Sequence, residues 1–178
     1  MSLDESAKMA LSSLLKEQYF HKNDIIQQPG SQCRTLYFVT EGIARIFYYH
    51  NSDDVTEYFA FSGDIIIRAE SLFTGQATPK GIQAVTDGKL VAIPAAPLFE
   101  LFNSHHDIER IFNKIFIEAY VATLKRVESL QFKNATERYQ DLAKQTDWVH
   151  QIPLKYIASY LGITQVSLSR IRAQIRHH

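Results

Sequence analysis

The chain reads IPLKYIASYLGITQVSLSRIRAQI from residue 152 to residue 175. This stretch predicts two short helices joined by a tight turn. The first helix begins near Pro153, whose missing N–H has no helical partner at a first position, and runs to about Leu161. Gly162 permits the positive φ that closes a helix, and Thr164 is a suitable N-cap for the second helix.

Apolar residues recur at helical spacing on one face of each predicted helix. They are Leu154, Ile157, Ala158 and Leu161 in the first helix, and Leu168, Ile171 and Ile175 in the second. The polar residues of the second helix then point outward: Gln165, Ser167, Ser169, Arg170 and Arg172. Such a polar front is what a helix-turn-helix offers to the DNA major groove. An ordinary pair of packed helices would show the same apolar and glycine positions.

Charge favours the DNA-binding interpretation. Residues 148–178 contain four basic residues and no acidic one, namely Lys155, Arg170, Arg172 and Arg176. The chain as a whole has 19 Lys and Arg against 19 Asp and Glu, so its formal net charge is zero. A basic end on a neutral chain indicates a polyanionic partner for that end.

Composition places the chain among soluble globular proteins of one or two domains. It has 178 residues, of which 46% are hydrophobic and 21% are charged. Cys33 is the only cysteine, which excludes an internal disulfide and is typical of a reducing compartment. The N-terminus lacks the pattern of a signal peptide, and no apolar run approaches the ~20 residues of a membrane helix. We therefore expect a cytoplasmic protein without a membrane partner.

The first part of the chain predicts a short amphipathic helix at residues 2–18 and then an all-β region. Runs rich in β-branched and aromatic residues occur at 24–27, 35–39, 43–49, 56–61, 82–85 and 90–93. Turn residues such as Asp87-Gly88 separate them, which favours an antiparallel β-roll or barrel. No helical pattern alternates with these runs, so a parallel sheet is not expected.

Helical patterns dominate the rest of the chain, at residues 95–102, about 107–132 and 134–145. The longest would extend about 39 Å. Its apolar positions cover more than one face, which favours a second copy of the same helix as a partner. The alternative is a helix that lies wholly within one monomer.

The order of these parts resembles the Crp/Fnr family of bacterial transcription regulators, over nearly the whole chain. The most specific likeness is KYIASYLGIT at 155–164 followed by SLSRIR at 167–172, which is most similar to the Bacteroidetes-type branch. Residues 36–42 and 62–76 support it. The resemblance implies an α+β fold with an N-terminal antiparallel β-roll (a jelly-roll) at residues 1–106. A dimerisation helix at 107–133 and a helix-turn-helix domain at 134–178, without room for a full wing, would follow.

The effector site departs from this resemblance. Members that bind cyclic nucleotides place Gly-Glu at the ribose and Arg-Ser or Arg-Thr at the phosphate. Here the first pair is Gly63-Asp64, and the Arg-Ser/Thr pair falls on Thr78-Pro79, so the guanidinium fork is missing. Arg68 and Lys80 are the nearby cations, which could rescue an anion site or be solvated surface charges. The candidate effector residues are therefore Gly63, Asp64, Arg68, Thr78 and Lys80, with no cofactor expected, cyclic AMP or GMP disfavoured, and another small effector or none left open.

The resemblance also implies how DNA is read. Gln165 and Arg170 would face base edges, assisted by Ser169. Phosphate contacts would come from Thr164, Ser167, Lys155 and Arg172. For a dimer we expect a roughly palindromic operator on double-stranded DNA, with RNA polymerase left open as a further partner.

Two other classes of function fit parts of the sequence. A small-molecule-binding β-roll could use its helical end for protein contacts. A β-roll enzyme of the cupin type would need a His and Glu metal cluster, but the predicted strands hold only Glu57, with His50 at a strand end. His105 and His106 are adjacent and would point apart on a helix, so they do not predict a metal site. The sequence therefore gives no support for an enzyme.

Overall fold

Residues 3–145 and 147–176 are described by the computed structural model, and within them the chain forms eight strands and eight helices. The strands are β1 (Lys16–Phe20), β2 (Ile25–Gln27), β3 (Thr35–Glu41), β4 (Ala44–His50), β5 (Asp53–Ala60), β6 (Ile65–Ile66), β7 (Gly81–Ala84) and β8 (Gly88–Pro94). The helices are α1 (Glu5–Leu14), α2 (Ala69–Thr74), α3 (Ala95–Phe102), α4 (His106–Phe132), α5 (Ala135–Gln145), the 3₁₀ helix η1 (Asp147–His150), α6 (Leu154–Tyr160) and α7 (Gln165–Arg176).

The strands form two four-stranded antiparallel sheets, in the orders β1-β8-β3-β6 and β2-β7-β4-β5. Side chains of both sheets meet in one core that contains Val39, Ile46, Ile66, Ile82 and Leu90. This is the predicted antiparallel β-roll of the jelly-roll type, and it is confirmed. The sheets remain separate, so the structure is not a closed barrel.

The β4–β5 hairpin forms for a local reason. Asn51 and Ser52 both have positive φ, at 50° and 71°. Two positive φ values in a two-residue loop are the signature of the hairpin turn whose twist matches that of the strands. The hairpin places β5 at the edge of its sheet, where one side of the strand has no neighbouring strand.

The N-terminal prediction was wrong in part. The helix ends at Leu14, and residues 16–18, which were predicted to belong to it, are in β1 and pair with β8. The burial pattern of β1 is exposed at every position except Phe20, so it lacks the alternation that marks a strand. Its pairing with β8, about 70 residues later in the chain, decides its conformation.

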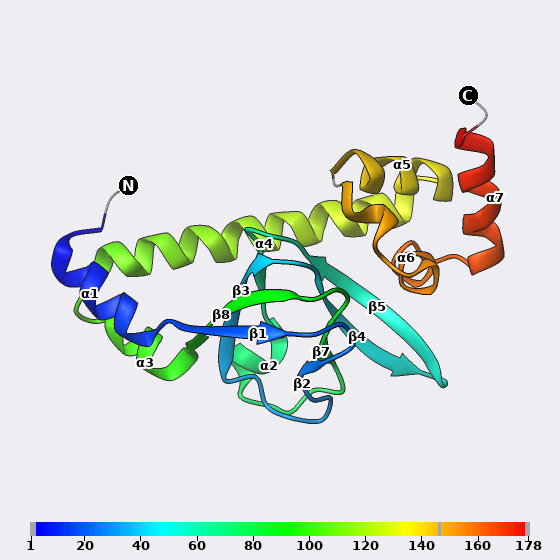
Figure 1. The fold of residues 1–178 in the computed structure, drawn as a ribbon. Helices are drawn as coiled ribbons and strands as arrows, with labels where there is room; N and C mark the ends of the chain where they lie inside the picture. The colour runs from blue at the N-terminus through cyan, green and yellow to red at the C-terminus, as the bar shows by residue number, and fades with distance from the viewer. Residues whose placement is uncertain (1–2, 146, 177–178) are drawn as a thin grey trace.

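The long helix lies alongside the roll, and α5, α6 and α7 gather at its C-terminal end, far from α1 and α3 (Figure 1). Only the first part of α4 is well covered, because Ile108 and Phe112 pack into a core with Leu36, Leu98 and neighbouring phenylalanines. Within the described residues, no helix is long and apolar enough to cross a membrane.

A further hydrophobic core joins the helical end to the roll. It contains Ile43, Phe59 and Val85 from the roll together with Tyr156 and Leu168 from the helix pair. Helix α4 ends at Phe132, and the next residue, Lys133, is extended and leads into α5. The roll and the helix pair α6–α7 share this core, so the helix pair packs directly against the roll.

Candidate nucleic-acid interface

The predicted helix-turn-helix is present with its predicted turn. Gly162 has a φ of +68°, and the N–H of Ile163 donates to the carbonyl of Ala158 at 3.0 Å, which closes α6. The hydroxyl oxygen of Thr164 accepts the N–H of Ser167 at 3.1 Å, so Thr164 is the predicted N-cap of α7. Pro153 lies one residue before α6, with φ −53° and ψ 136°, as its N-cap rather than its first helical residue.

The apolar faces of the two helices are buried as predicted. Ile157, Ala158, Leu161, Leu168 and Ile171 are each at most 7% exposed. Tyr139 and Leu142 of α5 lie in the same core and pack against the pair. The helix pair therefore has an apolar interior of its own, shared with α5.

The polar front of α7 is open to solvent. Gln165, Ser169 and Arg170 are all exposed, and so is Thr164 at the cap, while Ser167 is half-buried. Gln165 and Ser169 are four residues apart and therefore share one side of the helix, with Arg170 beside them. In Figure 1, α7 stands at the extreme end of the molecule, beyond the end of α4.

Arg172 does not belong to this front, although the family resemblance predicted a phosphate contact there. Its guanidinium donates to the carbonyl of Val149 at 3.2 Å and lies over the ring of Tyr139, 5.5 Å from the centroid. Its Nε is buried without a hydrogen-bond partner among the described residues. Arg172 therefore lies on the side of α7 that faces η1 and α5, and its charge is used within the domain.

Two arginines that the sequence did not single out hold α6 in place. Arg126 of α4 donates to the carbonyl of Tyr160 at 2.7 Å and lies over the ring of the same residue. Arg138 of α5 donates to the carbonyl of Leu161 at 2.9 Å. Cations at the C-terminal end of a helix satisfy its free carbonyls and oppose its dipole. Burial lowers the pKa of Arg126, which still remains protonated at neutral pH.

Lys155 lies exposed on α6, with its Nζ 4.7 Å from the centre of the Tyr156 ring. It lies on the first helix of the pair, whereas the front belongs to α7. Six of the seven predicted DNA-binding residues thus lie on the helix pair or its turn with exposed or half-buried side chains that no other part of the domain engages as it does Arg172: Thr164, Gln165, Ser167, Ser169, Arg170 and Lys155.

The predicted effector residues, unlike those at the front of α7, are engaged in contacts within the β-roll. Gly63 has a φ of +95° and forms a turn in which the carboxylate of Asp64 accepts the N–H of Phe61 at 2.9 Å. Burial raises the pKa of Asp64. Lys80 pairs with Glu57 at 2.6 Å, and Thr78 is buried. These residues serve the roll's own turns and ion pairs.

The sequence interpretation of Arg68 was wrong. This residue was expected to be a solvated surface charge or part of an anion site, but its side chain is buried, with only 2% exposed. Its guanidinium donates to the side-chain oxygen of Gln27 and to the carbonyls of Gln28, Ser31 and Lys80, at 2.7 to 3.1 Å. A fifth bond goes to the hydroxyl of Ser31 at 3.1 Å. Arg68 thus ties its own segment to two loops of the roll that are far from it in sequence.

A metal-binding site requires several side chains that can bind the ion to lie close together. Among residues 3–145 and 147–176, no three His, Cys, Asp or Glu side chains gather closely enough to bind a metal ion.

Comparisons with known proteins agree with the fold. The family model described as "Cyclic nucleotide-binding domain" matches residues 17–105, half of the chain. No curated protein sequence matches.

Many solved structures resemble the chain. FixK2 from Bradyrhizobium japonicum has a TM-score of 0.80 at 17% identity, covering 92% of this chain and 85% of that one. The c-di-GMP responsive global regulator CLP from Xanthomonas campestris has a TM-score of 0.73 at 16% identity, covering 98% and 92%. A protein from Eubacterium rectale assigned to the crp/fnr family of transcriptional regulators has a TM-score of 0.74 at 20% identity, covering 98% and 84%. The chain belongs to the cyclic nucleotide-binding domain family and has the fold of Crp/Fnr regulators.

Proposed function

We propose that the protein is a dimeric transcription regulator that binds double-stranded DNA in a sequence-specific manner, in the cytoplasm. The observation that carries this proposal is the exposed front of α7, with Gln165, Ser169 and Arg170 in a segment free of carboxylates. Two of the similar structures support it, since CLP is a global regulator of gene expression and the Eubacterium rectale protein is assigned to a family of transcriptional regulators. A contact with RNA polymerase belongs to the same proposal and stays a prediction.

The chemistry of reading follows from the exposed side chains. The guanidinium of Arg170 can donate two hydrogen bonds to O6 and N7 of guanine, and the amide of Gln165 can pair with N6 and N7 of adenine. Thr164, Ser167 and Lys155 would contact phosphates and set the register of the helix. Arg172 is left out because its guanidinium is engaged within the domain.

The dimer would form through the uncovered part of α4. Ile117, Tyr120, Leu124 and Val127 are each at least 44% exposed. Their spacing of three, four and three residues is the a/d seam of a coiled coil, which buries such residues against a second helix. Leu130 and Phe132 extend the apolar surface toward the helix pair. A two-fold dimer would present two α7 helices to successive major grooves, about 34 Å apart, and would favour a palindromic operator.

Substitutions on the helix pair separate reading from phosphate contact. Arg170→Ala should abolish the preference for operator over unrelated DNA, since a bidentate base contact contributes about 1–3 kcal/mol of discrimination per half-site. Lys155→Ala should weaken both DNAs to a similar degree and lower the salt dependence by about one phosphate per half-site. Binding by fluorescence anisotropy, on operator fragments obtained by selection from random DNA, measures both effects.

Lys22→Ala, on an exposed loop of the roll, is the matched control and should change neither quantity. If the Arg170→Ala variant keeps its full preference for the operator, α7 is not the helix that reads the bases.

We further propose that the roll does not respond to cyclic AMP or cyclic GMP. Of the two nearby cations, Arg68 is only 2% exposed and each nitrogen of its guanidinium already donates to the protein's own oxygens, while Lys80 is paired with Glu57. Neither nucleotide at millimolar concentration should raise the melting temperature, because only a ligand of the native state stabilises it. A saturable rise of several degrees with either nucleotide would contradict this.

A further inference from the structure

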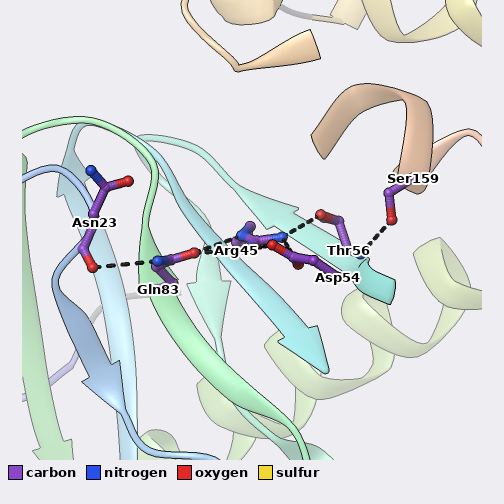
Figure 2. A network of polar contacts seen from close by, with 6 residues as sticks. All are labelled: Asn23, Arg45, Asp54, Thr56, Gln83 and Ser159. Atoms are coloured by element: carbon purple, nitrogen blue, oxygen red, sulfur yellow. Dashed lines mark hydrogen bonds and ion pairs between the residues drawn. The ribbon is translucent and has the colours of Figure 1, made fainter. Parts of the chain in front are cut away.

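The helix pair is fastened to the roll at the edge strand β5. The backbone N–H of Thr56 donates to the hydroxyl of Ser159 on α6 at 2.8 Å. Figure 2 shows Ser159 reaching from its helix to the strand. An edge strand has backbone donors that need partners, and here a side chain of the helix pair provides one.

A second contact lies beside the first and rests on Arg45 of β4. This arginine is 1% exposed. Its guanidinium donates to the carboxylate of Asp54 at 2.6 and 2.8 Å, to Gln83 Oε1 at 2.7 and 3.0 Å, and to the hydroxyl of Thr56 at 2.8 Å (Figure 2). All five of its N–H groups therefore have partners on the roll.

With every in-plane donor engaged, Arg45 can offer a partner only the face of its guanidinium. Tyr156 of α6 takes that face, with the centre of its ring 3.5 Å from the guanidinium carbon. Stacking of an aromatic ring on a desolvated guanidinium is favourable and depends on geometry. The roll thus presents a rigid platform, and the helix pair covers it.

Neighbouring contacts fix α6 in the remaining directions. Tyr160 packs on Phe59 of β5, with ring centres 5.1 Å apart, and its carbonyl accepts a bond from Arg126 of α4. Because α7 packs on α6, the place of the reading helix is set through α6 by the roll and α4 together. In this docked arrangement the front of α7 stays exposed.

We propose that Arg45 and Thr56 of the roll are positioning residues for DNA reading. By holding Tyr156 and Ser159, they fix the separation and orientation of the two α7 helices in the dimer, and the docked arrangement is the one that binds DNA. This inference rests on the proposed function and deepens it, since it makes the β4–β5 face part of the DNA-binding apparatus.

Docking of the helix pair on the roll should affect binding to a palindrome, which has two half-sites, but not binding to a single half-site. A helix pair that is loosened from the roll keeps its own fold and its own base contacts, so it binds a single half-site as before. The second half-site then loses the high effective concentration that a fixed geometry provides. Loss of positioning therefore lowers the advantage of a palindrome, whereas loss of folding lowers binding to every DNA.

The test uses Ser159→Ala combined with Tyr156→Leu, with Tyr156→Phe as the control that keeps the aromatic ring over Arg45. Affinities are measured for a half-site, for the selected palindrome and for a palindrome whose half-sites are moved apart by about half a helical turn. For the double variant, half-site affinity should stay within about threefold of the parent, while the preference for the correctly spaced palindrome should fall at least about tenfold. Tyr156→Phe should match the parent on all three DNAs.

A double variant that keeps both palindrome preference and spacing preference overturns the inference. If the parent protein itself fails to bind any double-stranded DNA, the proposed function fails instead, so the two failures are distinguishable.

A measurement on the unaltered protein decides the same point if the double variant loses half-site binding as well. The amide hydrogen of Thr56 should exchange slowly in the free protein, and its protection should be kept or increased when operator DNA is bound. Loss of that protection on DNA binding would show that the helix pair leaves the roll to bind, and would overturn the inference.

Discussion

Leu124→Glu combined with Val127→Glu is expected to convert the protein from a dimer to a monomer and to lower operator affinity by more than about a hundredfold. Both side chains belong to the proposed a/d seam on the uncovered part of α4, where they are 44% and 45% exposed. Two carboxylates at adjacent seam positions of a coiled coil would face their own copies and would be desolvated without a cation. When the two α4 helices no longer pair, each monomer has a single α7 helix. The gain in affinity from binding two half-sites is then lost.

Sedimentation equilibrium measures the mass of the variant, and anisotropy measures its DNA affinity. The matched control is Ala122→Glu with Lys125→Glu, which places two carboxylates on exposed positions of the same helix outside the seam. The control should stay dimeric. A double seam variant that sediments as a dimer would contradict the proposed interface.

Arg68→Ala is expected to destabilise the fold by on the order of 2–5 kcal/mol, the largest loss of stability that we expect among the candidate site residues. The substitution leaves the carbonyls of Gln28, Ser31 and Lys80 without the donor that they share. It also opens a void where a long side chain was buried. The midpoint of urea unfolding should fall markedly, with little change in slope.

Lys80→Ala is the natural comparison, because the sequence placed the two cations in the same candidate site. The Lys80 side chain is 27% exposed and pairs with Glu57, which is 40% exposed. Such a pair near the surface contributes about 0–1 kcal/mol. Equal, small losses for the two variants would mean that Arg68 does not hold the loops together.

The sequence predicted best where local rules decide the structure. Helix α3 has the predicted bounds, and Gly162 and Thr164 form the predicted turn and cap. Asn134, at the start of the predicted helix, exchanges hydrogen bonds with Glu137 in a capping box that begins α5. Each of these features depends on residues within a few positions of one another, so the pattern contains the whole cause.

Prediction failed where the cause lies far along the chain. The conformation of β1 depends on β8, and the role of Arg68 depends on the end of β2 with the loop that follows it, and on Lys80. Arg172 is two positions from Arg170 on α7, and which of the two faces solvent depends on where η1 and α5 pack. The stacking of Arg45 on Tyr156 could not be predicted, because the two residues lie far apart in the chain.

The salt dependence of binding to selected operator DNA shows whether α7 contacts the phosphates and bases of a duplex. If the front of α7 enters the major groove, the dissociation constant should rise steeply between about 50 and 200 mM salt, because phosphate contacts release counterions in proportion to their number. A logarithmic slope with a magnitude of about 4 or more for the dimer is the predicted result. Absence of binding to double-stranded DNA, or an affinity that does not change with salt, would contradict the proposed role of α7 as a DNA-reading helix.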